Sequence, residues 1–300
     1  MKRGLPKRIR KRILRSLVGR FFVTLLVRRN QQSIIRAANF NKRISLSPWN
    51  KNGSWEHYYH FIFDLLLPLS CVMDRTSEDV TFSIDGQGPL FKVLPQIFGK
   101  RVELNKRVGT SSVKKMNIVS MNPILANLKN EKLDCLKENV FKCYKVKTTA
   151  VPNKVLLIER LPSDSFFNEK AKRKGSGANR RSIKNHNEFC NMLRSKLDSR
   201  FEFHNLKLEE ISFEDQVKYF ESAALIIGQH GAGLANVIWM QEGSNVIELG
   251  NGRKHFQHLC TIKKHNQFII NYRKKHIKVP LDKFYQWMVS HEQLAKFFAA

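Results

Sequence analysis

The chain has 300 residues, a formal net charge of +28 and 42% hydrophobic residues. This composition is typical of a folded protein and argues against a disordered or fibrous chain. The longest apolar runs, such as residues 21–27, are shorter than the roughly 20 residues that a membrane-spanning helix needs. We therefore expect a folded protein without a membrane-spanning helix, long enough for two domains.

The five cysteines are scattered along the chain and form no Cys-x-x-Cys pair. Neither a disulfide framework nor a structural zinc site is expected, and a reducing compartment fits best. The apolar stretch near the N-terminus is interrupted by Arg20 and lacks a small-residue cleavage site, so no secretory signal is expected. These features predict a cytoplasmic protein, although a mitochondrial transit peptide, also rich in Arg and poor in acids, stays open as an alternative.

Residues 1–46 form a basic N-terminal segment, and fifteen Lys and Arg precede the first acidic residue, Glu56. Apolar residues recur there at helical spacing: Ile13, Leu14, Leu17, Val18, Phe21, Phe22, Leu25 and Leu26. This pattern predicts an amphipathic helix. Such a helix could attach peripherally to an anionic membrane surface through residues 7–29, or pack on its own domain with solvated charges. A nucleic-acid-binding arm fits less well, because it would not need so many aliphatic side chains.

The next part of the chain, residues 47–150, is predicted to form a first α/β domain. A polar loop over 47–54 precedes a strongly apolar helix over 57–73, which Pro68 is expected to kink or end. Short strands are predicted at 80–84, 101–104 and 117–119, with helices near 89–97 and within 122–150.

Residues 151–280 alternate strands and helices more clearly. Strands are predicted at 155–158, 201–203, 224–227, 245–249 and 268–270. Helices are predicted at 187–197, 212–222 and 233–240. This alternation favours a parallel sheet with helices on both faces. The last helix, within residues 281–300, is expected to pack back on the first domain.

A glycine-rich turn follows the strand at 224–227, with glycines at Gly228, Gly231 and Gly233. A turn of this kind at a helix start exposes N–H groups that suit a phosphate or diphosphate, and glycine lets the anion approach closely. His230 can donate a hydrogen bond to the same anion. Glu248 closes the next strand, where a carboxylate can accept hydrogen bonds from both hydroxyls of a ribose. The alternative, that the glycines only allow tight packing and Glu248 faces solvent, explains the combination less well.

Three sequence blocks resemble glycosyltransferase family 61. The most distinctive is G-Q-H-G-A-G-L-A-N at 228–236, followed by G-S-N-V-I-E-L at 243–249. The second is Y-Y-H-F-I-F-D-L-L-L-P-L at 58–69, and the third combines 155–160 with 179–185. Two departures stand out: His57 replaces the Asn that usually precedes the second block, and a basic insertion at 170–177 divides the third.

The resemblance implies a GT-B-like fold, in which two Rossmann-like α/β domains face a cleft. Residues 47–150 would form the acceptor side and residues 151–280 the nucleotide-sugar side. It further implies an inverting transfer from a nucleotide sugar, most commonly UDP-linked, to a hydroxyl of a glycan, glycolipid or protein. The donor would contact residues in and after the glycine turn: Gly228, His230, Gly231, Ala232, Gly233, Leu234, Asn236 and Glu248.

An inverting transfer needs a base for the acceptor hydroxyl and stabilisation of the departing diphosphate. His60 and Asp64 lie four residues apart on one helix face. Asp64 could be the base, or His60 could be the base oriented by Asp64; the alternative is that both are structural. Arg160 and Arg181 could clamp the diphosphate. No Asp-x-Asp pair occurs in the chain, so no metal is expected, and no cofactor besides the nucleotide-sugar donor.

The competing hypothesis is a basic, non-catalytic protein that binds nucleic acid or nucleotides. It explains the net charge of +28. The basic residues, however, come without an aromatic-interleaved recognition motif, and the glycine turn and Glu248 would have no role in binding nucleic acid. A nucleic-acid partner is therefore the less favoured interpretation.

Overall fold

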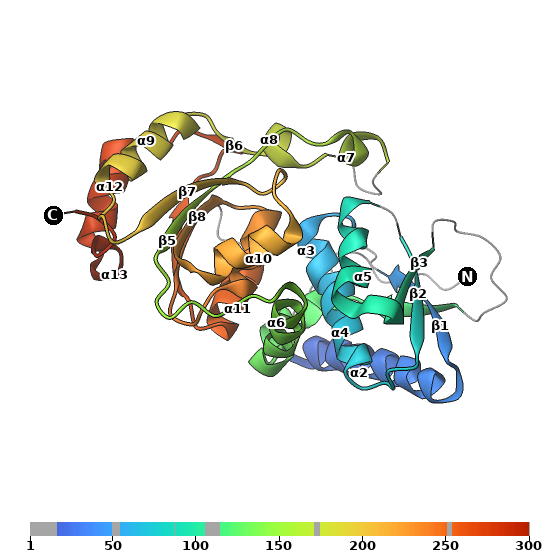
Figure 1. Cartoon of the computed structure of the whole chain (residues 1–300). Helices are drawn as coiled ribbons and strands as arrows, with labels where there is room; N and C mark the ends of the chain where they lie inside the picture. The colour runs from blue at the N-terminus through green and yellow to red at the C-terminus, as the bar shows by residue number, and fades with distance from the viewer. Residues whose placement is uncertain are drawn as a thin grey trace. The chain divides into compact units, whose positions relative to one another are not determined.

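A computed structural model describes residues 17–49, 55–86, 88–105, 115–170, 175–250 and 254–299. The chain divides into two compact units, Met1–Leu136 and Lys137–Ala300, which are described separately (Figure 1). The division falls within helix α6 (Asn130–Tyr144), before the boundary at residue 150 predicted from the sequence.

The first unit contains a parallel sheet of four strands in the order β3-β2-β1-β4. The strands are β1 (Arg43–Trp49), β2 (Thr81–Asp85), β3 (Val102–Asn105) and β4 (Lys115–Val119). Numbered along the chain, the strand order is 3-2-1-4, which is part of the order found in dinucleotide-binding sheets. The chain changes its direction of winding between β1 and β4. Ligands bind at the carboxyl edge of such a sheet, where the order reverses.

The sequence predicted β2, β3 and β4 correctly but missed β1. Residues up to 46 were assigned to the basic helical segment and residues 47–54 to a loop. The structure instead forms a central strand over Arg43–Trp49, with Ile44 and Leu46 buried. The serines and Pro48 in this strand resemble loop residues, and pairing with two neighbours outweighs their low strand propensity.

Helix α2 (Leu17–Phe40) precedes the sheet and contacts its strands β1 and β4, and it buries Val27, Ile34 and Ala38. Its Asn30 binds the backbone of edge strand β4. The side-chain amide donates to the Asn117 carbonyl over 2.8 Å and its oxygen accepts from the Val119 N–H over 3.0 Å. The predicted helix is confirmed from residue 17 onward, but Phe21, Phe22 and Leu26 of the predicted apolar face are exposed. Residues 1–16 lie outside the described part of the chain.

The apolar helix predicted over 57–73 is confirmed, with an interruption. It consists of α3 (Tyr58–His60), a π-helical turn η1 (Phe61–Leu66) and α4 (Leu67–Met73). Every residue of η1 and α4 is buried. Pro68 does not end the helix: it stands at the start of α4, directly after the π-helical turn, and the Phe63 carbonyl in that turn accepts from the Met121 N–H over 2.9 Å. The remaining short helices of this unit are η2 (Pro89–Lys92), α5 (Val93–Phe98), η3 (Gly99–Arg101) and η4 (Asn122–Asn127).

The second unit contains a five-stranded parallel sheet in the order β10-β9-β8-β5-β7. Its strands are β5 (Lys154–Glu159), β7 (Glu202–Lys207), β8 (Ala223–Gln229), β9 (Asn245–Gly250) and β10 (Asn266–Asn271). All five confirm the predicted strands and their parallel arrangement. The order along the chain is 2-1-3-4-5, that of a doubly wound sheet whose switch point lies between β5 and β8.

Helices flank this sheet, as the alternating pattern predicted. They are α7 (Ser165–Glu169), α8 (Gly177–Arg180), α9 (His186–Lys196), α10 (Phe213–Glu221), η5 (Ala232–Trp239), α11 (Lys254–Ile262), α12 (Leu281–Ser290) and α13 (Glu292–Ala295). A short parallel pair, β6 (Ser182–Ile183) with β11 (His276–Ile277), was not predicted.

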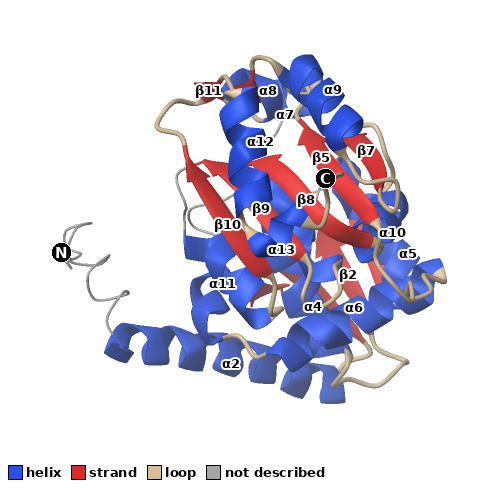
Figure 2. Ribbon diagram, turned by 90° about the vertical axis from the view of Figure 1, so that its left-hand side faces the viewer, coloured by secondary structure: helices blue, strands red, loops and turns tan. Residues whose placement is uncertain are grey.

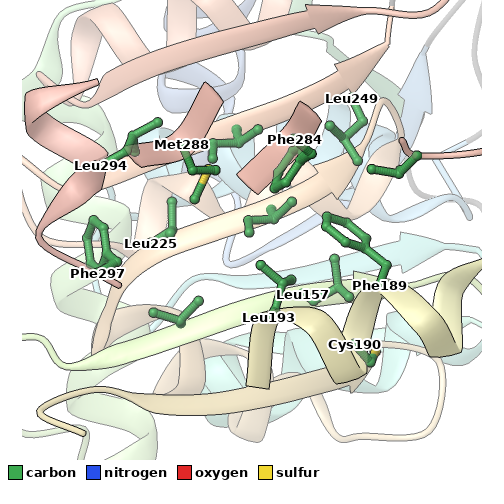
Figure 3. Packing of buried hydrophobic residues seen from close by; sticks show 14 of the residues in the cluster. Leu157, Phe189, Cys190, Leu193, Leu225, Leu249, Phe284, Met288, Leu294 and Phe297 are labelled. Carbon is green, nitrogen blue, oxygen red and sulfur yellow. The ribbon is translucent and has the colours of Figure 1, made fainter. Parts of the chain in front are cut away.

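The expectation that the last helix packs on the first unit is wrong. Helices α12 and α13 lie across the sheet of the second unit (Figure 2). Phe284 and Met288 of α12 join a buried cluster with Leu157, Leu225 and Leu249 from the strands (Figure 3). The apolar face of this helix therefore completes the core of its own unit, where burying it removes apolar surface from water.

No helix in the described ranges is both long enough and apolar enough to cross a bilayer.

Candidate functional site

In the first unit, the π-helical turn brings His60 and Asp64 together. The His60 Nδ1 lies 2.7 Å from the Asp64 Oδ2. The Asp64 side chain is fully buried, whereas 20% of the His60 side chain is exposed. π-Helical turns are rare and frequently occur at functional sites. Asp64 is therefore the buried member of the pair and His60 the more exposed one; whether Asp64 or His60 is the base, or both are structural, stays a prediction.

Ser120 is a third member of this cluster, which sequence reasoning missed. It follows β4 directly and is 6% exposed. Its hydroxyl donates a hydrogen bond to Asp64 Oδ1. A serine after a short strand belongs to no motif, so only the folding of β4 against η1 reveals the contact. Because β4 borders the switch point of this sheet, the cluster lies where doubly wound sheets bind ligands.

The cluster has a defined protonation chemistry. A carboxylate bound to Nδ1 selects the tautomer in which Nδ1 carries the proton, so that Nε2 is the ring nitrogen with an acceptor lone pair. Tyr59 lies beside the pair, with its ring centroid 5.5 Å from that of His60. Burial and the charge of Asp64 raise the Tyr59 pKa, so the phenol stays protonated at neutral pH. Tyr59 therefore adds no negative charge beside the pair.

In the second unit, the glycine turn follows β8 at the switch point. His230 donates its backbone N–H to the Leu249 carbonyl over 2.9 Å, which ties the turn to β9. The helix predicted after the turn is present as a 3-10 helix, η5, rather than an α-helix. Asn236 is fully buried and its amide donates to the Gly233 carbonyl and to Gln216. Asn236 therefore positions the start of η5, and its predicted contact with the donor stays a prediction.

The glycines of the turn have different structural roles. A Cβ at Gly228 would lie 3.1 Å from Ile158, and one at Gly233 would lie 2.6 Å from Leu208. Both positions are therefore explained by close packing, as the alternative interpretation proposed. At Gly231 a Cβ would lie 2.1 Å from the Arg160 Nη1. Glycine at 231 therefore makes room for a guanidinium beside the turn. Two further residues of the turn were predicted to contact the donor: Leu234 is buried, and Ala232 is partly exposed.

Two arginines converge on this turn. Arg160, directly after β5, and Arg181 each donate to the His230 carbonyl over 3.2 Å. Burial and the charges of Arg181 and Arg180 lower the pKa of Arg160 to about 10, against a smaller opposing effect of Glu209. Arg160 is therefore still protonated at neutral pH. Its buried Nε has no hydrogen-bond acceptor within the described part of the chain. The site thus concentrates positive charge and offers an unused donor, which suits an anion.

The segment between the two arginines folds back through Gly177. This residue has φ +58, and a Cβ there would lie 2.1 Å from the Leu161 carbonyl oxygen. The Ala178 N–H donates to that oxygen over 2.6 Å, and Arg160 Nη2 donates to the Gly177 carbonyl over 3.1 Å. The positive φ and the close approach both require glycine. This turn brings Arg181 back beside Arg160.

Glu248 lies beneath the turn instead of facing solvent. It is fully buried, and its Oε1 lies 2.5 Å from the His230 Nδ1. Gln267 donates to Oε2 over 3.2 Å. Burial and the charge of Glu248 raise the pKa of Cys260 to about 12, so this thiol stays neutral. Both carboxylate oxygens thus have protein partners, which favours a role in orienting His230. The predicted contact of Glu248 with a ribose stays a prediction.

No group of three or more His, Cys, Asp or Glu side chains in the described ranges could hold a metal ion. The prediction of transfer without a metal is not tested by this finding.

Comparison with known proteins identifies the family of this chain. The sequence model of Glycosyltransferase 61 matches residues 58–247. The chain belongs to this family. The match includes the His60–Asp64 pair, both arginines and the glycine turn, and it ends one residue before Glu248.

Curated relatives share a shorter segment. Three curated relatives are each 28% identical to this chain over 103 residues. They are the EGF domain-specific O-linked N-acetylglucosamine transferases of Canis lupus familiaris, Pan troglodytes and Bos taurus. The matched segment covers 34% of this chain and 20% of each relative. It therefore spans only a fifth of the length of these relatives.

Proposed function

We propose that this protein is an inverting glycosyltransferase that moves a sugar from a nucleotide-sugar donor to a hydroxyl group. The observation that carries the proposal is the convergence of Arg160 and Arg181 on the His230 carbonyl at the switch point of a doubly wound sheet. Membership in glycosyltransferase family 61 supports the reaction class.

The second unit would bind the donor. A diphosphate beside Gly231 would accept hydrogen bonds from Arg160 and Arg181 and offset their mutual repulsion. His230, held at Nδ1 by Glu248, would donate from Nε2 when the ring is protonated. These groups would also stabilise the negative charge on the leaving diphosphate. This charge increases in the transition state, so its stabilisation there accelerates the reaction.

The first unit would bind the acceptor. The acceptor hydroxyl would give its proton to the Nε2 of His60 while its oxygen attacks the anomeric carbon. The bond from that carbon to the diphosphate oxygen would break on the opposite face, so the configuration inverts. Asp64 would stabilise the imidazolium that forms. This reaction requires the two units to face one cleft as a GT-B-like fold, which we include in the proposal.

The relatives suggest which substrates to test first. Their names specify N-acetylglucosamine as the transferred sugar and an EGF domain as the acceptor. We propose a UDP-linked sugar as the donor class, with UDP-N-acetylglucosamine the first candidate. Glycan, glycolipid and protein hydroxyls are all acceptors to be tested, because the match covers 20% of those relatives.

Donor binding can be tested by thermal shift with UDP, UDP-sugars and other nucleoside diphosphates. Binding raises the unfolding midpoint by mass action. Arg181→Gln should weaken UDP binding by about 10- to 100-fold, the effect of losing a charge-assisted hydrogen bond. Arg180→Gln is the matched control, because it removes the same charge from an exposed neighbour. No shift with any nucleotide would contradict the proposal, and binding without sugar transfer would favour the non-catalytic alternative.

We also propose that helix α2 rests on an anionic membrane surface. Phe21, Phe22 and Leu26 are 67%, 58% and 61% exposed, although the same helix buries Val27 and Ile34. The exposed cations Arg28 and Arg29 follow directly, and no acidic residue precedes Glu56. Packing on its own domain explains the buried face of α2 but not the exposed aromatic one. Apolar burial together with cations is the combination that binds anionic lipid.

Co-sedimentation with lipid vesicles tests the membrane proposal. The protein should bind vesicles containing phosphatidylserine more strongly than vesicles of phosphatidylcholine alone, and the difference should decrease with salt. Replacing Phe21, Phe22 and Leu26 together by Ser should reduce binding. Phe40→Ser is the control, since Phe40 is 88% exposed at the other end of α2. Equal binding by both variants would contradict the proposal.

A further inference from the structure

Ser120 contacts the carboxylate of the proposed catalytic pair, His60 and Asp64. The two oxygens of the Asp64 carboxylate have different partners. Oδ2 lies 2.7 Å from His60 Nδ1, and Oδ1 accepts from the Ser120 hydroxyl. Ser120 is therefore one of the contacts that set the direction in which Asp64 presents Oδ2 to His60.

The backbone on both sides of Ser120 is anchored. The Val119 N–H donates to the side-chain oxygen of Asn30 on α2 over 3.0 Å. The Met121 N–H donates to the Phe63 carbonyl over 2.9 Å. Phe63 belongs to the π-helical turn and directly precedes Asp64. The loop that supplies the hydroxyl is thus bound to the turn that supplies the carboxylate, which holds Ser120 and Asp64 at a constant separation.

We propose that Ser120 is a positioning residue for the proton transfer at His60. A fully buried carboxylate needs hydrogen-bond donors for both oxygens. By binding Oδ1, Ser120 keeps Oδ2 directed at the Nδ1–H of His60 and leaves Nε2 as the proton acceptor. This inference rests on the proposed function, in which His60 removes the proton from the acceptor hydroxyl.

A matched pair of substitutions isolates the hydroxyl. Thr and Val have nearly the same size, but only Thr retains the hydroxyl, so Ser120→Thr and Ser120→Val add similar volume to the buried site. With the whole 300-residue chain and UDP-N-acetylglucosamine, release of UDP should be about tenfold slower in Ser120→Val, with the donor KM unchanged. Ser120→Thr should remain close to the wild-type rate. Equal rates for the two variants would overturn the proposal.

A double-mutant cycle tests whether Ser120 acts through Asp64. In an Asp64→Asn background, Ser120→Ala should slow UDP release little further, because residues in one network are not additive. Ser120→Ala adds no volume and therefore also serves if Ser120→Val does not fold. Fully additive effects would overturn the proposal.

A spectroscopic measurement separates this inference from the proposed function. Nitrogen-15 NMR of labelled histidine reports which ring nitrogen of His60 carries the proton, whether or not the protein turns over a donor. Wild type and Ser120→Thr should show the Nδ1–H tautomer, and Ser120→Ala a mixture. Identical spectra would overturn the role of Ser120. An inactive wild type with these expected spectra would instead count against glycosyl transfer alone.

Discussion

Arg160 and Arg181 each donate a hydrogen bond to one backbone oxygen, that of His230, over 3.2 Å. Burial disfavours the charged form of Arg160, and the neighbouring cation Arg181 repels it; together these effects lower the Arg160 pKa to about 10, although Glu209 acts in the opposite direction. An anion between them would offset this cost. In the proposed function, the diphosphate of the donor supplies this negative charge.

Gly231→Ala should weaken nucleotide binding with little effect on stability. The backbone at Gly231 is extended, with φ −178, so alanine fits the conformation. Its Cβ would displace the Arg160 guanidinium, whose Nη1 lies 2.1 Å away. The Kd for UDP, measured by calorimetry, should rise about tenfold through the loss of one charge-assisted hydrogen bond.

Gly228→Ala is the matched control for that substitution. Its Cβ would press on Ile158 and Leu234, at 3.1 and 3.2 Å. Overpacking of this kind costs about 1–3 kcal/mol of unfolding free energy. If Gly228→Ala weakens UDP binding as much as Gly231→Ala does, the special role of Arg160 at Gly231 is wrong.

Glu248→Gln should distinguish the two roles of this residue. If Glu248 acts by orienting His230, the substitution should weaken binding of inorganic pyrophosphate and of UDP by similar factors. If it contacts the ribose, pyrophosphate binding should be unchanged. We expect the first result, because Glu248 is fully buried and its carboxylate lies 2.5 Å from His230 Nδ1. Calorimetric titration with both ligands gives the comparison.

His60→Gln and Asp64→Asn should each slow sugar transfer while UDP binding stays intact. General base catalysis contributes about 10²- to 10⁴-fold to such reactions. The asparagine amide can no longer accept the Nδ1–H in the same way, so His60 would lose its preferred tautomer. UDP release under saturating donor gives the rate, and thermal shift with UDP gives the binding. Wild-type rates in both variants would exclude the pair from catalysis.

His265 should make stability depend on pH in the acidic range. Burial lowers the pKa of this imidazole from 6.5 to about 4, so between these values the unfolded chain binds a proton that the folded chain does not. Stability should therefore decrease as pH falls from about 6.5 to 4, by up to about 3 kcal/mol. His265→Gln should flatten this part of the curve in urea unfolding. A wild-type slope in the variant would contradict the assignment.

The second unit was the more predictable of the two. Its buried strands are continuous apolar runs separated by polar helices, and such runs predict a parallel sheet directly. Strand β1 of the first unit was missed, because Ser45, Ser47 and Pro48 resemble loop residues. The final helix was assigned to the wrong unit, since an amphipathic pattern shows that a face is buried but not what covers it.

For the candidate site, too, some features could be predicted from the sequence and others could not. The local patterns identified the glycine turn, His230 and the spacing of His60 and Asp64, because each is a short stretch of chain with its own chemistry. They could not assign Glu248 to His230, find Ser120, or show that two arginines share one carbonyl. These contacts join residues 18, 56, 70 and 49 positions apart.

From the amino-acid order alone came the parallel α/β class, the family resemblance and the residue types available for binding and proton transfer, since these depend on periodicity and motif. Only the tertiary structure decided which side chains are buried and which donor meets which acceptor. The reason is physical: hydrogen bonds between distant positions form when strands place their carboxyl ends at one edge of a sheet. Strand order results from packing of the whole core and is not encoded in any single segment.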